Sequence, residues 1–224
     1  MTLTMETEKG AFTAADFRWR AGCYAVPLER AAEAAVGFPH FRGDHELNPD
    51  LPAATMPRGE LRLAAVLVPV VDRCGEATVI LTLRAAHLSA HAGQIAFPGG
   101  KAASGDATII ETALRETEEE IGLSPRYVTP VGLLDIYRTG TGFHVVPVLA
   151  VVKPGFTLAV DEQEVADVFE VPLEFLMTES NHQRHAREIQ GALRHFHAMP
   201  YGERYIWGAT AGILRTMYER LYIK

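Results

Sequence analysis

The sequence predicts an α+β protein of mixed α/β character, in which helices pack against a mixed β-sheet. Strand-like segments rich in Val, Leu and Ile occur on both sides of one central amphipathic helix, which lies between Asp106 and Gly122. A second helical pattern follows near the end of the chain. The strands do not alternate regularly with helices, so a doubly wound parallel sheet is not expected.

The first 60 residues are predicted to form an N-terminal helical extension and a linker. Short helices are expected at Ala14 to Ala21 and at Leu28 to Val36. Residues 43–58 contain three prolines and several polar residues, which indicates a linker or a loop draped over the surface. We expect Phe17 and Trp19 to dock this region on the core.

The core strands are predicted in chain order. Leu61 to Val71 and Thr78 to Arg84 form a hairpin around Gly75. Residues 139–142 make a turn between two further strands, and Gly191 lies near the turn of a last hairpin. The remaining expected elements are strands at Val128 to Tyr137, His144 to Val152 and Val165 to Pro172, a hairpin at Arg187 to His197, and a closing helix at Trp207 to Leu221.

The central helix has recognisable ends and two faces. Asp106 suits the N-cap and Gly122 suits the left-handed position that ends a helix. Apolar residues recur at helical spacing and predict a buried stripe, while Glu116, Glu119 and Glu120 fall within an arc of roughly 100° on the opposite side. The helical spacing lets Arg115 brace Glu111 or Glu119, because each lies four residues away. The stripe residues are Ile110, Ala113, Leu114, Thr117 and Ile121.

Three glutamates in the last turn of a helix carry an energetic cost. Like charges at this spacing repel each other, and the helix dipole disfavours anions at this end by roughly 0.3–1 kcal/mol each. A bound divalent cation removes both penalties, and carboxylate oxygens suit Mg²⁺ or Mn²⁺. The turn at Gly99 and Gly100, just before the helix, can present backbone N–H groups to phosphate oxygens. The pattern indicates a site for a metal-bridged diphosphate; a solvated acidic face is the alternative.

These residues resemble a known family. Arg115 to Leu123 is similar to the end of the Nudix box, the signature of Nudix hydrolases, with Thr117 a mild departure at an apolar position. The resemblance covers residues 61–224 and implies a Nudix hydrolase domain with an α/β/α sandwich, a mixed sheet and one catalytic helix. It also implies a metal-dependent pyrophosphohydrolase, which cleaves phosphoric anhydride bonds.

Two upstream segments resemble the extra signature of the coenzyme A pyrophosphatase branch. They are Ile80 to Arg84 and Gly93 to Gly100. This resemblance implies cleavage of coenzyme A or its derivatives to 4′-phosphopantetheine and adenosine 3′,5′-bisphosphate. Ala85 and Ser89 stand where that branch tends to carry Ser and Arg, and Ala103 stands where Asp is common. Another nucleoside diphosphate derivative, such as ADP-ribose or a dinucleotide, is therefore kept as the alternative substrate.

The resemblance also implies roles for individual residues. Glu116 and Glu120 are the expected metal ligands, and Glu119 is either a third ligand or the general base. Arg115 orients Glu119, and Glu162 or Glu164 is the candidate for a distal acid or base after the box. The alternative for these two residues is a solvated turn that leads into an edge strand. The residues expected to bind substrate are Arg84, His91, Gly99, Gly100 and Lys101.

Composition sets further bounds on partners. A net charge of −7 argues against a broad electrostatic grip on nucleic acid. The chain has two cysteines, Cys23 and Cys74, which form no disulfide framework and indicate a cytoplasmic protein. No apolar run is long enough to span a membrane. The sequence is compatible with either a monomer or a homodimer. A binding module that has kept the fold and lost catalysis is a third hypothesis, against which the intact glutamates argue.

Overall fold

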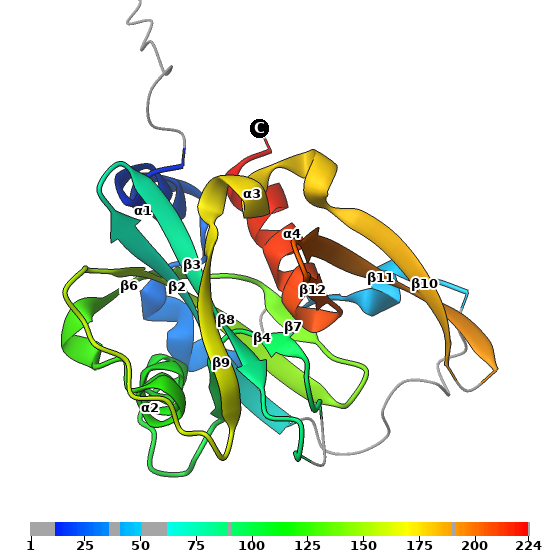
Figure 1. The fold of residues 1–224 in the computed structure, drawn as a ribbon, viewed down its shortest axis with the longest axis horizontal. Coiled ribbons are helices and arrows are strands. Elements are labelled where there is room, and N and C mark those ends of the chain that lie inside the picture. The colour runs from blue at the N-terminus through cyan, green and yellow to red at the C-terminus, as the bar shows by residue number, and fades with distance from the viewer. Residues whose placement is uncertain (1–11, 36–40, 51–61, 89–90, 190, 224) are drawn as a thin grey trace, which may run out of the picture.

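The structure is a computed structural model that describes residues 12–35, 41–50, 62–88, 91–189 and 191–223. Within these residues a nine-stranded mixed sheet forms the centre, and a three-stranded antiparallel sheet lies at one side (Figure 1). Helices cover both faces of the larger sheet. The predicted fold class, α+β with helices against a mixed sheet, is confirmed.

The strands fall into these two sheets. The larger sheet contains β1 (Phe41–Gly43), β2 (Arg62–Arg73), β3 (Glu76–Arg84), β4 (Ile95–Ala96), β5 (Gly99–Lys101), β6 (Val128–Leu133), β7 (Ile136–Arg138), β8 (Phe143–Val152) and β9 (Val165–Pro172). The smaller sheet contains β10 (Gln183–Ile189), β11 (Ala192–Tyr201) and β12 (Arg204–Trp207).

Both parallel and antiparallel pairs occur in the larger sheet. β2 runs parallel to β8, and β1 runs parallel to β7. β2 and β3 form the predicted antiparallel hairpin, but their far ends pair with two different short strands. β5 pairs with β2, where Val66 lies opposite Gly99, and β4 pairs with β3, where Leu83 lies opposite Ile95. The segment from β4 to β5 is therefore held between the two central strands.

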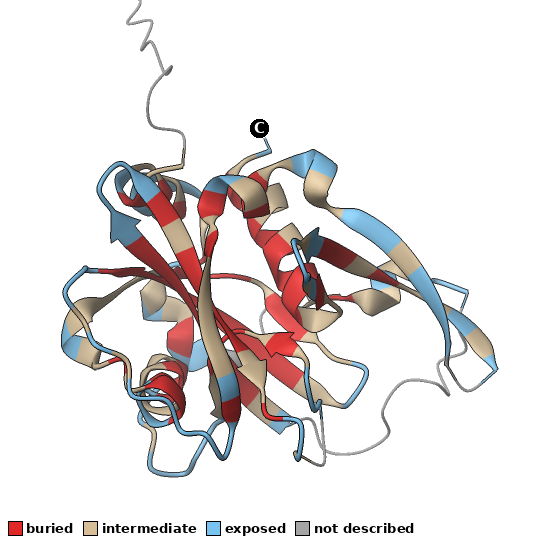
Figure 2. Cartoon of the chain, viewed as in Figure 1, coloured by how far each residue is buried: buried red, intermediate tan, exposed pale blue. Residues whose placement is uncertain are grey.

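Side chains alternate between the two faces of β2, and both faces are buried. Val68 and Val70 belong to one apolar cluster, with residues of α1 (Ala14–Tyr24), α3 (Leu173–Met177) and α4 (Ala209–Leu221). Leu67 and Val71 belong to another cluster, with residues of α2 (Ile109–Ile121). Figure 2 shows the buried strands between these helical layers. This arrangement is the α/β/α sandwich, and it explains why β2 is apolar along almost its whole length.

The N-cap of α2 differs from the prediction. Thr108 has extended backbone angles, and its Oγ1 accepts a hydrogen bond from the Glu111 N–H at 3.2 Å. Asp106 lies two residues earlier, and its carboxylate is used by other partners. Gly122 ends the helix as predicted, because it adopts the left-handed conformation with φ of 69°. The sequence pattern predicted the end of the helix correctly. It did not identify the N-cap, because Asp106 and Thr108 both have side chains that can cap a helix.

The described N-terminal residues pack on the domain. α1 covers the predicted helix, and its Phe17 is fully buried, as expected. The prediction for Trp19 is wrong, since 54% of its surface is exposed. The second predicted helix is a 3₁₀-helix, Leu28–Ala35, and β1 adds to the sheet edge. Residues 36–40 and 51–61, which include much of the predicted linker, lie outside the described residues.

Several later elements differ in their boundaries. The single strand predicted at Val128 to Tyr137 is divided into β6 and β7, which pair with different parts of β8. The last predicted hairpin is longer at both ends than expected. The closing helix starts at Ala209 because Trp207 belongs to β12, a strand that the sequence pattern did not predict. No helix in the described part of the chain is long and apolar enough to cross a membrane.

Candidate active site

Glu120 lies at the centre of the candidate site. Its side chain is only 4% exposed, so it belongs to the buried face of α2 and not to the opposite arc that helical spacing predicted. Its Oε2 accepts a hydrogen bond from the Gly99 N–H at 3.0 Å, and its Oε1 lies 3.6 Å from Nη1 of Arg84. The strand β5 covers this part of the helix and excludes solvent from it. Burial of the Glu120 carboxylate is therefore a consequence of the sheet and not of the helix alone.

Glu116 lies one helical turn before Glu120 and faces the next glycine. A Cβ at Gly100 would overlap the Glu116 carboxylate in its present position, so a larger residue there would displace this side chain from the glycine turn. Oε1 of Glu116 accepts a hydrogen bond from Nη1 of Arg115 at 2.9 Å. The glycine pair and the two glutamates thus form one packed unit, which the sequence placed together only by spacing.

Arg115 links this unit to the loop that precedes α2. Its Nε and Nη2 bind the two oxygens of Asp106 at 2.8 and 2.9 Å, and its Nη1 also donates to Glu119 at 3.1 Å. Of the two partners that helical spacing allowed, Glu119 is bound, whereas Glu111 accepts the Ala107 N–H. The role of Asp106 was not predicted, because this carboxylate was assigned to the N-cap of the helix. An aspartate two residues before a Thr-capped helix is the signal that was available.

The carboxylates differ in their ionisation. The pKa of Glu120 is raised to about 7, mainly by burial, with smaller contributions from the nearby charges of Glu164 and Glu116. The Gly99 N–H and the Arg84 guanidinium oppose this effect only in part. Hydrogen bonds from Arg115 instead lower the pKa of Asp106 far below its usual value. The site therefore contains two different carboxylates: Glu120 is buried with few positively charged neighbours, whereas Asp106 is paired with Arg115.

The other predicted site residues lie around this centre. Arg84 ends β3 beside Glu120, and Glu164 is exposed, close enough to Glu120 to affect its pKa. Lys101 is exposed in β5, and its carbonyl accepts a 3.3 Å hydrogen bond from Arg115. His91 is exposed in the loop before β4, where its ring bonds the Gln94 side chain at 2.8 Å. Ser89, which stands where the coenzyme A pyrophosphatase branch tends to carry Arg, lies outside the described residues.

The donor set fits a divalent metal ion that keeps several non-protein ligands. No three His, Cys, Asp or Glu side chains converge on one point within the described residues, and the Glu119 side chain is 62% exposed. Mg²⁺ is commonly held by one or two carboxylates, with water and substrate phosphates as its other ligands. Glu116 and Glu120 supply two carboxylates on one face of the helix beside the backbone of Gly99 and Gly100. The shortage of positive charge around Glu120 favours a cation there.

The candidate site is thus a carboxylate-bearing helix packed on a glycine turn, inside an α/β/α sandwich. Residues 61–191 match the NUDIX domain family. The Nudix hydrolase NudL of Yersinia pestis (strain Pestoides F) is 38% identical over 162 residues, which cover 72% of this chain and 81% of that protein. NudL of Yersinia pseudotuberculosis (serotype O:1b) has the same identity and coverage. The chain belongs to the Nudix hydrolase family, whose members generally use divalent metal ions.

Solved structures show weaker likeness. A MutT/nudix family protein from Enterococcus faecalis is 15% identical, with a TM-score of 0.47, and the match covers 94% of this chain and 74% of that one. An Ap4A hydrolase from C. elegans is 23% identical, with a TM-score of 0.43, over 51% of this chain and 82% of that one.

Proposed function

We propose that this Nudix hydrolase cleaves the diphosphate bond of coenzyme A or its derivatives, giving 4′-phosphopantetheine and adenosine 3′,5′-bisphosphate. The observation that carries the proposal is the segment Gly93 to Gly100. Its sequence resembles the signature of the coenzyme A pyrophosphatase branch, and its last two residues pack against Glu120 and Glu116. The segment with the substrate signature is thus in contact with the carboxylates of the candidate active site.

The chain's own residues suggest how a diphosphate is cleaved. Glu116 and Glu120 would hold Mg²⁺ or Mn²⁺, which neutralises phosphate oxygens and lowers the pKa of a bound water. Backbone N–H groups around Gly99 and Gly100 and the side chains of Arg84, His91 and Lys101 would bind the anionic substrate. Arg115 would orient Glu119, to which it is bonded at 3.1 Å.

The general base is either Glu119 or Glu164. Glu119 is exposed and bonded to Arg115, while Glu164 is exposed in the chain leading into β9. A base must take a proton from the attacking water, so its removal should lower kcat far more than it raises KM. Glu119→Gln and Glu164→Gln should therefore be compared at saturating substrate. The variant with the larger loss of kcat identifies the base, and equal, small losses contradict both assignments.

A substrate panel tests the proposed specificity. We expect kcat/KM at one fixed Mg²⁺ concentration to be highest for coenzyme A, lower for 3′-dephospho-coenzyme A, and lowest for ADP-ribose. Discrimination by the 3′-phosphate should be modest, ~1–2 kcal/mol, about the value of one charge-assisted hydrogen bond. If ADP-ribose is the best of the three, the assignment to coenzyme A is wrong and the alternative, another nucleoside diphosphate derivative, replaces it. Repeating the panel with Mn²⁺ identifies the preferred ion.

A further inference from the structure

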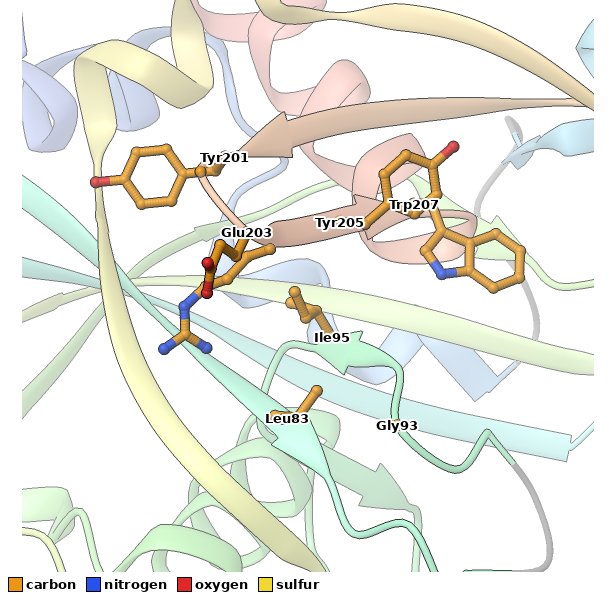
Figure 3. A pocket seen from close by; sticks show the side chains of 9 residues that line it. Leu83, Gly93, Ile95, Tyr201, Glu203, Tyr205 and Trp207 are labelled. Carbon is orange, nitrogen blue, oxygen red and sulfur yellow. The ribbon is translucent and has the colours of Figure 1, made fainter.

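A cavity lies beside the end of β3, where Leu83 precedes Arg84. It has a volume of about 920 Å³ and opens between the β3–β4 edge and the β11–β12 hairpin (Figure 3). Leu83, Gly93 and Ile95 line it from the larger sheet, and Tyr201, Tyr205 and Trp207 line it from the smaller one. The cavity therefore lies between the two sheets, and three aromatic residues from one hairpin contribute to its wall.

The cavity is structurally connected to the candidate active site. Leu83 directly precedes Arg84 in β3, and the Gly93 N–H donates to the Arg84 carbonyl at 3.1 Å. Arg84 itself reaches Glu120, with Nη1 3.6 Å from Oε1. The chain from Ile95 to Gly99 spans at most about 14 Å even when fully extended. A substrate that reaches from Gly99 to Ile95 would therefore enter the cavity.

The charges in the cavity do not favour a phosphate group. Arg204 is its cation, but Nη2 of Arg204 lies 2.8 Å from Asp167, and its guanidinium stacks on the Phe169 ring at 3.6 Å. Glu203 adds a further carboxylate to the rim. The local charge is thus neutral to negative, which disfavours phosphate and leaves a neutral group as the better occupant.

The aromatic side chains indicate what kind of neutral group fits. Tyr205 and Trp207 lie nearly parallel, with ring centroids 6.5 Å apart, and Tyr205 is 40% exposed. Exposed aromatic rings stack well on purine bases, because every base offers a π-face. An aliphatic arm would gain only burial from the same wall.

We propose that this cavity binds the purine base of the substrate, with Tyr205 and Trp207 as the stacking residues. The inference rests on the proposed function in that it takes the base to be the adenine of coenzyme A. Its phosphates then lie toward Gly99 and Gly100, and the β11–β12 hairpin contributes to specificity without touching the reacting atoms. Tyr205 and Trp207 are thus binding residues and not catalytic ones.

Fluorescence of Trp207 tests the proposal directly. The chain has two tryptophans, and the other, Trp19, is on α1, so Trp19→Phe leaves Trp207 as the single reporter. We titrate this variant with adenosine 3′,5′-bisphosphate in the presence of Mg²⁺, and separately with 4′-phosphopantetheine. The expected result is a saturable change with the adenosine compound alone. No change with the adenosine compound, or an equal change with 4′-phosphopantetheine, overturns the proposal.

Substitutions at Tyr205 sharpen this test. Tyr205→Leu should weaken binding of the adenosine compound about tenfold or more, by loss of stacking, and raise KM with little change in kcat. Tyr205→Phe keeps the ring and should bind like the parent, although it loses the 2.6 Å hydrogen bond to His185. Tyr24→Leu is the matched control, because Tyr24 is 38% exposed but lies on α1. Equal binding by the Tyr205→Leu and Tyr205→Phe variants contradicts the stacking role.

The two proposals can fail separately. If the protein hydrolyses coenzyme A while Tyr205→Leu changes neither KM nor fluorescence, the base site is wrong and the proposed function stands. If coenzyme A is not hydrolysed while adenosine 3′,5′-bisphosphate still binds through Tyr205, the base site stands and the proposed substrate is wrong. Circular dichroism melts of each variant show that the compared proteins are folded.

Discussion

The α2 end of the molecule and the β11–β12 hairpin handle charge in opposite ways. At α2, the Glu120 carboxylate is buried and has one N–H donor and one distant guanidinium for partners. At the hairpin, Arg204 is already paired with Asp167 and stacked on Phe169. An added cation is expected to stabilise the first region, whereas the cation of the second already has its partners.

This difference explains why one region carries a recognisable sequence pattern and the other does not. Two carboxylates one helical turn apart must keep their spacing to serve one ion, so their chemistry is visible in the sequence. The hairpin residues line one cavity with Leu83 and Ile95 only after β12 has been brought against β4. A binding surface made of separate elements has no fixed spacing to recognise.

Removing Glu120 should have the largest effect. Glu120→Gln keeps the shape of the side chain but loses both the charge and the expected metal ligand, so we expect kcat to fall by about three orders of magnitude or more. Glu116→Gln should have a comparable effect. Rates are measured at saturating coenzyme A and Mg²⁺, after a melt has shown that each protein is folded.

Glu118→Gln is the control for these two variants. Glu118 lies in the same helix, but its side chain is exposed and away from the glycine turn. It should keep nearly the full rate of the unmodified protein. Near-normal turnover of folded Glu120→Gln would mean that the charge shortage at α2 has no part in catalysis.

Gly99→Ala should have the next largest effect, on stability. Gly99 has φ of 147°, and a Cβ there would overlap the Ala65 carbonyl of β2, so the pairing of β5 with β2 would have to shift. We expect a loss of roughly 2–4 kcal/mol in the free energy of unfolding, from backbone strain and broken pairing. Gly105→Ala, where a Cβ meets nothing within 4 Å, should change stability little. Urea unfolding of both variants measures the difference, and equal stability would contradict the close packing.

The pKa of Glu120 predicts a smaller, pH-dependent effect. Its pKa is about 7 in the folded protein and 4.5 for the ordinary side chain, so the metal-free folded state holds the proton more tightly than the unfolded state. Stability should therefore fall as pH rises from about 4.5 to 7, on the order of 1–3 kcal/mol. Glu120→Gln removes this slope, whereas Glu118→Gln keeps it.

Mg²⁺ should act in the opposite direction across the same pH range. Metal binding needs the deprotonated carboxylate, so the gain in melting temperature with Mg²⁺ should be larger at pH 8 than at pH 5. Melts with and without Mg²⁺, for the unmodified protein and for Glu120→Gln, measure this gain. A gain that is independent of pH, or that persists in Glu120→Gln, would place the stabilising ion elsewhere.

The central elements could be predicted from the sequence, whereas features that depend on contacts between distant residues could not. The hairpin of β2 and β3, the end of α2 at Gly122 and the burial of Phe17 follow from local patterns, and the structure confirms them. The burial of Glu120 could not be predicted from helical spacing, because β5 and not α2 covers it. The strand β12 is four residues long and pairs with β11; it was not predicted, and its last residue, Trp207, was assigned to the following helix.

The partner of Arg115 shows the same limit within a single motif. Spacing along α2 allowed two glutamates as partners, and one of them, Glu119, is bound. The stronger partner, Asp106, comes from the loop nine residues earlier, and only the folded loop brings it within 2.8 Å. Local periodicity predicts neighbours on one helix, but it carries no information on how a flanking loop returns to that helix.

The smallest expected effect comes from the ion pair at the hairpin. Arg204→Met removes the charge but keeps an apolar stem against Phe169, and both Arg204 and Asp167 are partly exposed. Ion pairs in solvent contribute little, so the free energy of unfolding should change by less than about 1 kcal/mol. The turnover rate at saturating substrate should stay the same, because Arg204 is not expected to touch the diphosphate. Urea unfolding and steady-state kinetics measure both quantities. A large fall in kcat, comparable to that of Glu120→Gln, would mean that the hairpin shares the charge-dependent chemistry of α2, and the contrast between the two regions would be wrong.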